Sequence, residues 1–129
     1  MFPYELIRLS DDENEVVVTV LAAESPTLWE AEIAVRSMFV SGRTLLMLFP
    51  SKFEEWAAAL DRLAAGEDIA WMARHNGPTI RVFLDGARDC PDVEVDDESL
   101  SMVTVRIPIA LEGDWIGDHR ARLTRFLAG

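Results

Sequence analysis

Cysteine is almost absent from this 129-residue sequence, in which Cys90 is the only one. A lone cysteine excludes an internal disulfide and any zinc site built from several thiolates, and it fits a reducing compartment. Residues 1–5 lack the basic and then apolar pattern of a secretory signal. The longest apolar runs, around residues 16–23 and 45–50, are far too short to span a bilayer. We therefore expect a cytoplasmic protein that does not bind membranes.

Positive charge is also scarce, because 12 basic residues face 23 acidic ones and the formal net charge is -11. Such a chain repels nucleic-acid phosphates and attracts cationic surfaces. We expect no nucleic-acid partner, and a basic protein as the partner if there is one. Half of the residues are hydrophobic, so residues 1–129 are predicted to form one domain with a sizeable core.

The sequence contains none of the common catalytic or metal-binding motifs. HExxH, CxxC, GxSxG and a glycine-rich phosphate loop are all missing. His75 is expected in an exposed turn, and His119 is expected as a boundary histidine whose ring nitrogen is hydrogen-bonded. Cys90 is expected to be an incidental thiol. We predict no catalytic residue, no metal ligand and no cofactor, although carboxylates paired in three dimensions could still form an enzyme site.

Strands dominate the predicted first half of the chain. Trp29, Ala31, Ile33, Val35, Ser37 and Phe39 recur with period 2 and share one face. Ser41-Gly42-Arg43 is predicted to be the hairpin turn that follows. The unbroken apolar run after it predicts a central strand that is buried on both faces. The strands expected here are Tyr4–Leu9, Glu15–Leu21, Trp29–Phe39 and Thr44–Phe49, with a loop at Ala22–Pro26.

Two amphipathic helices are predicted. Ser51-Lys52-Phe53-Glu54 matches a capping box, so a helix is expected from about Lys52 to Ala65, with Gly66 as its stop. Gly113-Asp114 is expected to open the last helix, in which Asp118 can pair with Arg122 across one turn. The apolar stripe of the first helix includes Phe53, Trp56 and Leu60, and that of the last helix comprises Trp115, Ile116, His119, Leu123, Phe126 and Leu127.

The second half of the chain is predicted to return to strands between these helices. His75-Asn76-Gly77-Pro78 is a hairpin signal between two short apolar runs. The expected strands are Asp68–Ala73, Thr79–Leu84, Val93–Val95 and a long one over Leu100–Ala110. Grouped strands and helices predict an α+β fold, with a mostly antiparallel β-sheet of meanders and hairpins and the two helices packed on it. Most of the four tryptophans are expected in the core.

One stretch of the chain concentrates negative charge, and its acidic residues are Asp92, Glu94, Asp96, Asp97 and Glu98. Their spacing does not match a calcium-binding EF-hand loop. Two interpretations stay open. The stretch is either a solvated acidic loop or a docking surface that steers a basic protein partner.

Several segments of the chain resemble a family of small actinobacterial proteins of unknown function. An actinobacterial source also agrees with the basic residues, since eleven of the twelve are arginine. The resemblance implies no particular activity. The segments that carry it are Glu5–Asp11, Ala31–Ile33 continuing through Phe39–Gly42, Ala64–Asp68 and Gly77–Ile80.

The predicted element order also resembles the WapI-type immunity proteins of bacterial polymorphic-toxin systems. The shared features are a strand hairpin, a tryptophan-bearing helix with a glycine stop, a strand pair and a long late strand. This resemblance implies a role in neutralising a toxin by binding it. We therefore predict a non-enzymatic protein-binding module of the immunity type. The alternatives are a small enzyme with a carboxylate-based site and a self-associating structural or regulatory subunit.

Overall fold

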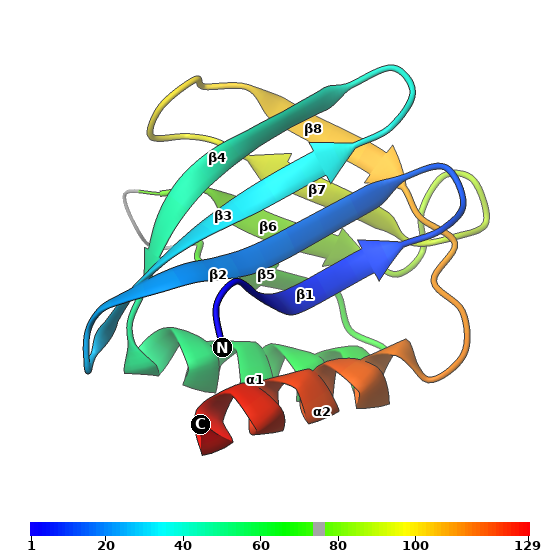
Figure 1. Ribbon diagram of the computed structural model, residues 1–129. Coiled ribbons are helices and arrows are strands. Elements are labelled where there is room, and N and C mark those ends of the chain that lie inside the picture. Colours follow the sequence, from blue (N-terminus) through cyan, green and yellow to red (C-terminus); the bar gives the residue numbers. More distant parts are fainter. Residues whose placement is uncertain (74–76) are drawn as a thin grey trace.

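The computed structural model describes residues 1–73 and 77–129, and within them the chain forms two antiparallel four-stranded sheets and two helices (Figure 1). Each strand pairs with its neighbours along the chain. The first sheet contains β1 (Tyr4–Ser10), β2 (Glu15–Ser25), β3 (Leu28–Arg36) and β4 (Ser41–Leu48). The second contains β5 (Ile69–Trp71), β6 (Thr79–Phe83), β7 (Asp92–Asp96) and β8 (Thr104–Pro108). The helices are α1 (Pro50–Ala64) and α2 (Trp115–Ala128).

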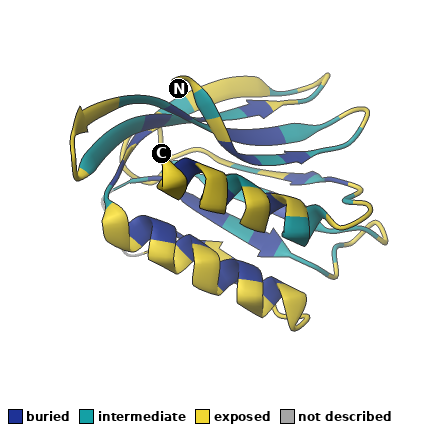
Figure 2. Ribbon diagram, turned by 60° about the horizontal axis from the view of Figure 1, so that its bottom comes forward, coloured by how far each residue is buried: buried dark blue, intermediate teal, exposed yellow. Residues whose placement is uncertain are grey.

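The two sheets lie face to face, and both helices lie together along one side of them (Figures 1 and 2). α2 packs against β1, and α1 packs against β5. The predicted α+β class with antiparallel sheets and two amphipathic helices is therefore confirmed. The sequence pattern did not predict that the strands form two separate sheets.

The core lies between the sheets and under the helices. Ala31, Ile33 and Val35 alternate along β3 and are buried, as the period-2 pattern predicted. In α1, Trp56 is fully buried, and its ring centroid lies 5.4 Å from that of Trp71 in β5. The core position predicted for the tryptophan of α1 is thus confirmed.

The turn between β3 and β4 lies four residues earlier than predicted. Ser37 donates its backbone N–H to the carbonyl of Val40 at 2.8 Å, and its hydroxyl oxygen accepts the N–H groups of Phe39 and Val40. A serine that bonds nearby backbone groups stabilises a tight turn. Ser41-Gly42-Arg43 instead opens β4, so the predicted turn there is wrong. Phe39 leaves the strand and is 96% exposed.

The prediction that Thr44–Phe49 forms a central strand is also wrong. β4 is the edge of the first sheet, paired only with β3. Leu46 and Leu48 point into the core, whereas Leu45 and Met47 point outward and are exposed. The side chains of this apolar run therefore alternate between the core and solvent, as in any strand with one buried face. The antiparallel pairing of these two segments, β3 and β4, as a hairpin is as predicted, and the observed register places Ile33 opposite Thr44.

The helix starts differ from each other. At α1 the N-cap is Phe49, which makes no side-chain cap, and Pro50 occupies the first turn. Proline suits this position, because its fixed φ is helical and its missing N–H would have no partner in the first turn. The helix thus begins before Ser51, and the capping box predicted there does not form. At α2, Asp114 does cap the helix and accepts the N–H of Gly117 at 2.9 Å. Near its end, Leu127 is exposed rather than part of the buried stripe.

Three further predicted boundaries are corrected. β2 continues through the expected loop as far as Ser25. The predicted strand from Leu100 begins only at Thr104, because residues 97–103 form a hydrogen-bonded connection. The strands of the predicted hairpin around residues 75–78 pair as β5 and β6, and His75 and Asn76 lie outside the described residues. Within the described ranges, no helix has both the length and the apolar character needed to cross a membrane.

Candidate functional site

The acidic stretch begins on a strand and not in a solvated loop. Asp92 is buried in β7 and accepts a hydrogen bond from Arg106 Nε at 3.0 Å. The guanidinium of Arg106 in turn lies over the ring of Phe83, 4.1 Å from its centroid. A buried carboxylate needs such a partner, because an unpaired buried charge is costly. Asp92 thus makes an internal contact within the second sheet.

The next two carboxylates share one arginine. Arg81 of β6 lies 3.1 Å from Glu94 and 3.4 Å from Asp96. All three side chains are partly exposed, so these pairs contribute little stability. They do neutralise part of the negative charge that the sequence places here. The solvated-loop interpretation is therefore wrong for the first three acidic residues.

Asp97 organises the connection between β7 and β8. Its carboxylate accepts the hydroxyl and the backbone N–H of Ser101 at 2.8 and 3.1 Å, and the hydroxyl of Thr44 at 3.0 Å. Its backbone also pairs with those of Met102 and Val103. Desolvation acts to raise the pKa of Asp97, but the hydrogen bonds from Ser101 and Thr44 outweigh it and hold the pKa below its usual value. Asp97 therefore ties this connection to β4.

Glu98 is the fully exposed member of the acidic stretch. A hydrogen bond to Asp96 and repulsion by its charge raise the pKa of Glu98. The two carboxylates therefore keep negative charge concentrated at the start of the connection. Of the five predicted partner-binding residues, Glu98 is the one that presents its carboxylate most openly to a partner.

The connection that Asp97 stabilises displays apolar side chains to solvent. Leu100, Met102 and Val103 are all exposed. Met102 has a φ of 64°, a left-handed conformation that is strained for a residue with a side chain. The backbone hydrogen bond from Met102 to Asp97 at 2.9 Å helps to hold it there.

A small cavity of about 230 Å³ opens between this connection and the first half of β4. Small-molecule sites typically measure about 300–1,000 Å³, so this cavity suits one inserted side chain better than a whole ligand. Its polar rim includes the Thr44–Asp97 hydrogen bond. Its apolar lining comes from both sheets, and it consists of Ile33, Val35, Val40, Val95, Val103 and Val105.

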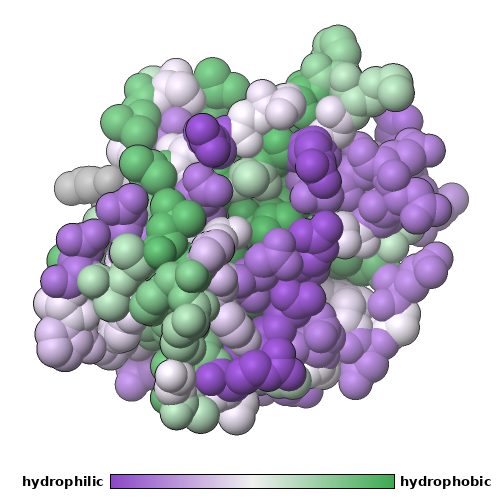
Figure 3. All heavy atoms as spheres, in the orientation of Figure 1, coloured by the Kyte–Doolittle hydropathy of each residue, from purple (hydrophilic) through white to green (hydrophobic). Residues whose placement is uncertain are grey.

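Exposed apolar side chains lie on the two segments that border this cavity, along the top and left of the molecule in Figure 3. Ten large hydrophobic residues are exposed in the part of the chain that the structure describes, and Met1, Phe2 and Leu127 lie near the chain ends. The other seven belong to the β3–β4 hairpin and the β7–β8 connection. We call this the open-edge surface, and it comprises Met38, Phe39, Leu45, Met47, Leu100, Met102 and Val103.

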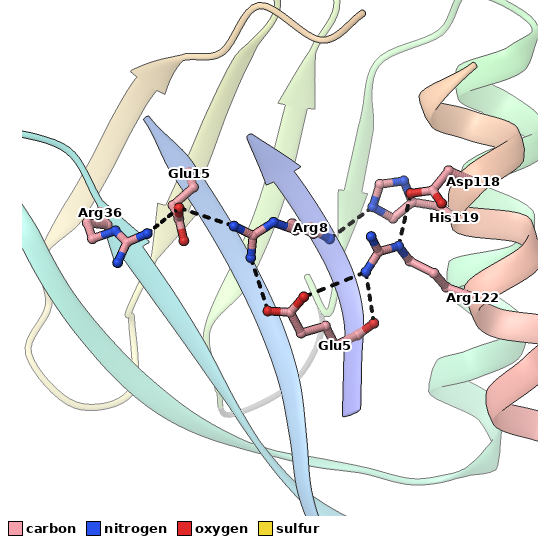
Figure 4. A network of polar contacts seen from close by, with 7 residues as sticks. All are labelled: Glu5, Arg8, Glu15, Arg36, Asp118, His119 and Arg122. Atoms are coloured by element: carbon pink, nitrogen blue, oxygen red, sulfur yellow. Dashed lines mark hydrogen bonds and ion pairs between the residues drawn. The ribbon is translucent and has the colours of Figure 1, made fainter. Parts of the chain in front are cut away.

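The opposite side of the first sheet is closed by α2 (Figure 4). His119 Nε2 accepts the backbone N–H of Arg8 at 3.0 Å, and His119 Nδ1 lies 2.6 Å from the carbonyl oxygen of Trp115. Nε2 must accept, so the proton of the neutral ring sits on Nδ1 and is donated to Trp115. His119 is buried with both nitrogens bonded, which confirms the prediction of a hydrogen-bonded boundary histidine.

Ion pairs continue this closure across the outer face of the first sheet (Figure 4). Arg122 pairs with Asp118 at 2.9 Å, as predicted, and also donates to the backbone carbonyl of Glu5 at 3.2 Å. Arg8 contacts both Glu5 and Glu15, and Glu15 also pairs with Arg36 at 2.6 Å. The Arg122 bond fastens α2 to the backbone of β1, and the pairs of Arg8, Glu15 and Arg36 link β1, β2 and β3.

A second, polar hollow lies where the β1–β2 turn meets residues 110–112. Asp11 belongs to it, but its carboxylate accepts the N–H groups of Glu13, Asn14 and Ala110. Desolvation acts to raise the pKa of Asp11, and these three hydrogen bonds outweigh it and lower the pKa. Asp11 is thus engaged in holding the turn. Among the described residues, no three histidine, cysteine or carboxylate groups converge as metal ligands would.

The sequence pattern did not reveal the residues of the open-edge surface. Met38 and Phe39 were expected within a strand, and Leu45 and Met47 within a central one. The one available signal was the serine at position 37, which can start a turn before two apolar residues.

These features define a small α+β protein of two antiparallel sheets, in which one sheet edge and the apolar surface beside it are uncovered. A family of unknown function (DUF5959) matches residues 4–129, so the chain belongs to this family. The resemblance to a family without an assigned activity is thereby confirmed. No curated protein and no solved structure matches the chain.

Proposed function

We propose that this chain is a non-enzymatic, cytoplasmic protein-binding module that binds a basic protein through its open-edge surface. The observation that carries the proposal is that seven exposed apolar side chains lie on the two segments that border a cavity sized for a side chain. Soluble monomers rarely keep large apolar patches exposed, and such patches with polar rims mark interaction sites. The strained Met102 within this surface agrees with a functional role.

The chemistry of the partner follows from charge. The chain has a net charge of -11, and Glu98, Glu30 and Glu32 border the open-edge surface or lie on the neighbouring strand. Complementary charge raises the association rate and disfavours acidic partners. A basic protein therefore fits both the apolar surface and its rim.

The more specific form of the proposal is an immunity-type protein of actinobacteria that neutralises a basic toxin. Three features support it: the resemblance in element order to WapI-type immunity proteins, the arginine-rich composition and the acidic excess. Toxins that attack nucleic acids are commonly basic, so an acidic inhibitor gains association rate against them.

The partner can be sought with a photo-crosslinking residue placed at Met47. A matched control carries the same residue at Leu127, which is also exposed but belongs to α2 and not to the open-edge surface. The proposal expects a basic protein that crosslinks at position 47 and not at 127. Equal crosslinking at the two positions, or none at either, would contradict it.

The captured protein is then purified and titrated against wild-type chain and a Phe39→Ser, Met47→Ser variant by calorimetry. Both residues are exposed, so the variant should fold, and we expect binding to weaken at least tenfold.

For the immunity role, co-expression of the wild-type chain should suppress the toxicity of the partner, and the variant should not. A purified chain that dimerises in light scattering would instead favour the self-associating subunit.

Electrostatic steering needs a variant that leaves the fold intact. Serine at positions 96, 97 and 98 together would also break the contacts of Asp97 with Ser101 and Thr44. Glu98→Gln removes an exposed charge without this damage, and Glu54→Gln on α1 serves as the control. We expect only the former to slow association, by about two- to fivefold at low salt, and the difference to vanish as salt screens it. If the wild-type chain and the Glu98→Gln variant associate at equal rates, the acidic stretch does not steer the partner and has a structural role only.

A further inference from the structure

The two sheets have four edge strands, which are β1, β4, β5 and β8. The outer side of an edge strand carries backbone N–H and C=O groups that can pair with a strand of another chain. Proteins usually protect such edges with short strands, bulges, proline, charged residues or a covering helix. The protection of each edge therefore tells where an added strand could pair.

Side chains of α2 protect the β1 edge. His119 accepts the backbone N–H of Arg8, and Arg122 donates to the carbonyl of Glu5 (Figure 4). The pairing of β1 with β2 is also irregular between Glu5 and Ile7, and a bulge twists an edge away from further pairing. An added strand at β1 would have to displace α2.

The two edges of the second sheet are protected by other means. β5 has only three residues and packs against α1. β8 has five residues and ends at Pro108, and it carries Arg106 in its middle. Proline removes a pairing N–H, and a strand of five residues offers few backbone groups to a partner. Both edges are poor templates.

The β4 edge has much less protection. It is eight residues long, contains no proline, and presents Leu45 and Met47 outward. In the described part of the chain neither helix has its main packing contacts with β4. Its one charged residue, Arg43, lies near its start. The β7–β8 connection contacts the first half of β4 through the Thr44–Asp97 hydrogen bond, so the open part is the apolar second half, residues 45–48. An apolar edge of this kind is a hazard unless a partner pairs with it.

We propose that β4 receives an extended segment of the basic partner, which adds to the first sheet as a fifth strand. This inference rests on the proposed function and specifies how the partner binds. Main-chain hydrogen bonds to β4 supply affinity in this mode, and alternate side chains of the segment supply specificity. It also explains why three edges are closed and the fourth is left open.

The register of the first sheet defines the side chains that such a segment needs. Its outward residues would lie beside Leu45 and Met47, whose partners on β3 are Glu32 and Glu30. Arginine or lysine fits here, because the stem can cover the apolar side chains while the cation reaches Glu30, or reaches Glu32 beside its long 3.9 Å contact with Arg43. Its inward residues would face the side of Leu46 and the cavity, where apolar side chains fit. The segment therefore alternates apolar and basic residues.

A second copy of this chain fits the edge less well. Each copy carries a net charge of -11, so two copies repel each other. The outward residues of β4 are Arg43, Leu45 and Met47. They supply one cation for the two carboxylates of β3, whereas an alternating basic segment supplies one for each.

The test uses a capped eight-residue peptide of alternating valine and arginine. Its control has the same sequence, with all inner residues N-methylated so that neither edge of the peptide can pair. Both peptides have the same charge and side chains, so non-specific attraction to an acidic protein is matched. We expect the control to bind at least tenfold more weakly.

The chain is also tested as Leu45→Lys, with Leu127→Lys as a control at a similarly exposed position (54% and 59%). Only the former should lose peptide binding.

The direct measurement is amide hydrogen exchange by NMR with and without the peptide. Strand addition predicts new protection at alternate amides of β4 and none at β8. Equal binding of both peptides, protection absent from β4, no saturable binding, or dimerisation of the chain through β4 would each overturn the proposal. The earlier crosslinking separates the two ideas. A partner that crosslinks at Met47 without protecting β4 amides keeps the binding surface and removes strand addition.

Discussion

His119 should make the stability of this protein fall as the pH drops below neutrality. The ring is buried, and its two nitrogens have fixed opposite roles, accepting from Arg8 and donating to Trp115. Desolvation lowers the pKa of His119 below its model-compound value of 6.5. The hydrogen bond that His119 Nδ1 donates to the carbonyl of Trp115 and the charge of Asp118 oppose this shift, and the charge of Arg122 adds to it. A proton on Nε2 would also face the N–H of Arg8 and break that hydrogen bond.

The sign and size of the effect follow from proton linkage. Between the lowered pKa of the folded state and 6.5, the unfolded chain binds more protons at this position than the folded one. The contribution of His119 to the free energy of unfolding is therefore constant well above pH 6.5. Below that pH it falls by about 1.4 kcal/mol per pH unit, until the folded-state pKa is reached. The pH at which the fall ends measures that pKa.

Urea unfolding at pH 7.5 to 5, followed by the fluorescence of the buried tryptophans, measures this slope. His119→Gln is the control, since its amide oxygen can still accept from Arg8 but does not titrate. We expect this variant to lose about 1–3 kcal/mol at pH 7.5, because Trp115 loses its hydrogen bond. Below pH 6.5 it should show a shallower slope than wild type. Identical slopes in the two proteins would refute the assignment of the pH dependence to His119.

Three other changes are expected to affect stability in distinct ways, each measured by urea unfolding. Trp56→Ala should cost about 3–5 kcal/mol, since it empties a fully buried site; a loss below 1 kcal/mol would mean that the core collapses around the gap. Asp114→Ala should cost about 1 kcal/mol by removing the cap of α2, whereas Ser51→Ala should be nearly neutral because α1 has no side-chain cap; equal losses would contradict this asymmetry. Cys90→Ser should leave the fold and partner binding intact, and a fast reaction of Cys90 with a thiol reagent at neutral pH would argue against an incidental thiol.

Patterns that depend on local physics predicted much of the fold. The alternation in β3 and the helical spacing around Trp56 each record which side chains are buried. The Asp114 cap and the Asp118–Arg122 pair span three and four residues, so neighbouring positions in the sequence suffice to find them.

Features that depend on distant parts of the chain could not be predicted in this way. The apolar run of β4 is compatible with a central strand or with an edge strand that has apolar outward residues. The position of β4 at the edge follows from the sheet order, in which none of the described strands pairs with its outer side. Arg81 and Arg106 lie 15 and 14 residues from Asp96 and Asp92, so the sequence alone shows acidic residues without their arginines. The role of Asp97 similarly depends on Thr44, which is 53 residues away.

The closure of β1 by α2 also has a consequence for the order in which the chain is made. Protein synthesis runs from the N-terminus, so all four strands of the first sheet leave the ribosome before His119 and Arg122 do. During that interval both outer edges of the first sheet can pair with other nascent chains. α2 therefore protects the β1 edge as well as completing the core, and the nascent chain is most prone to aggregate just before this helix is made.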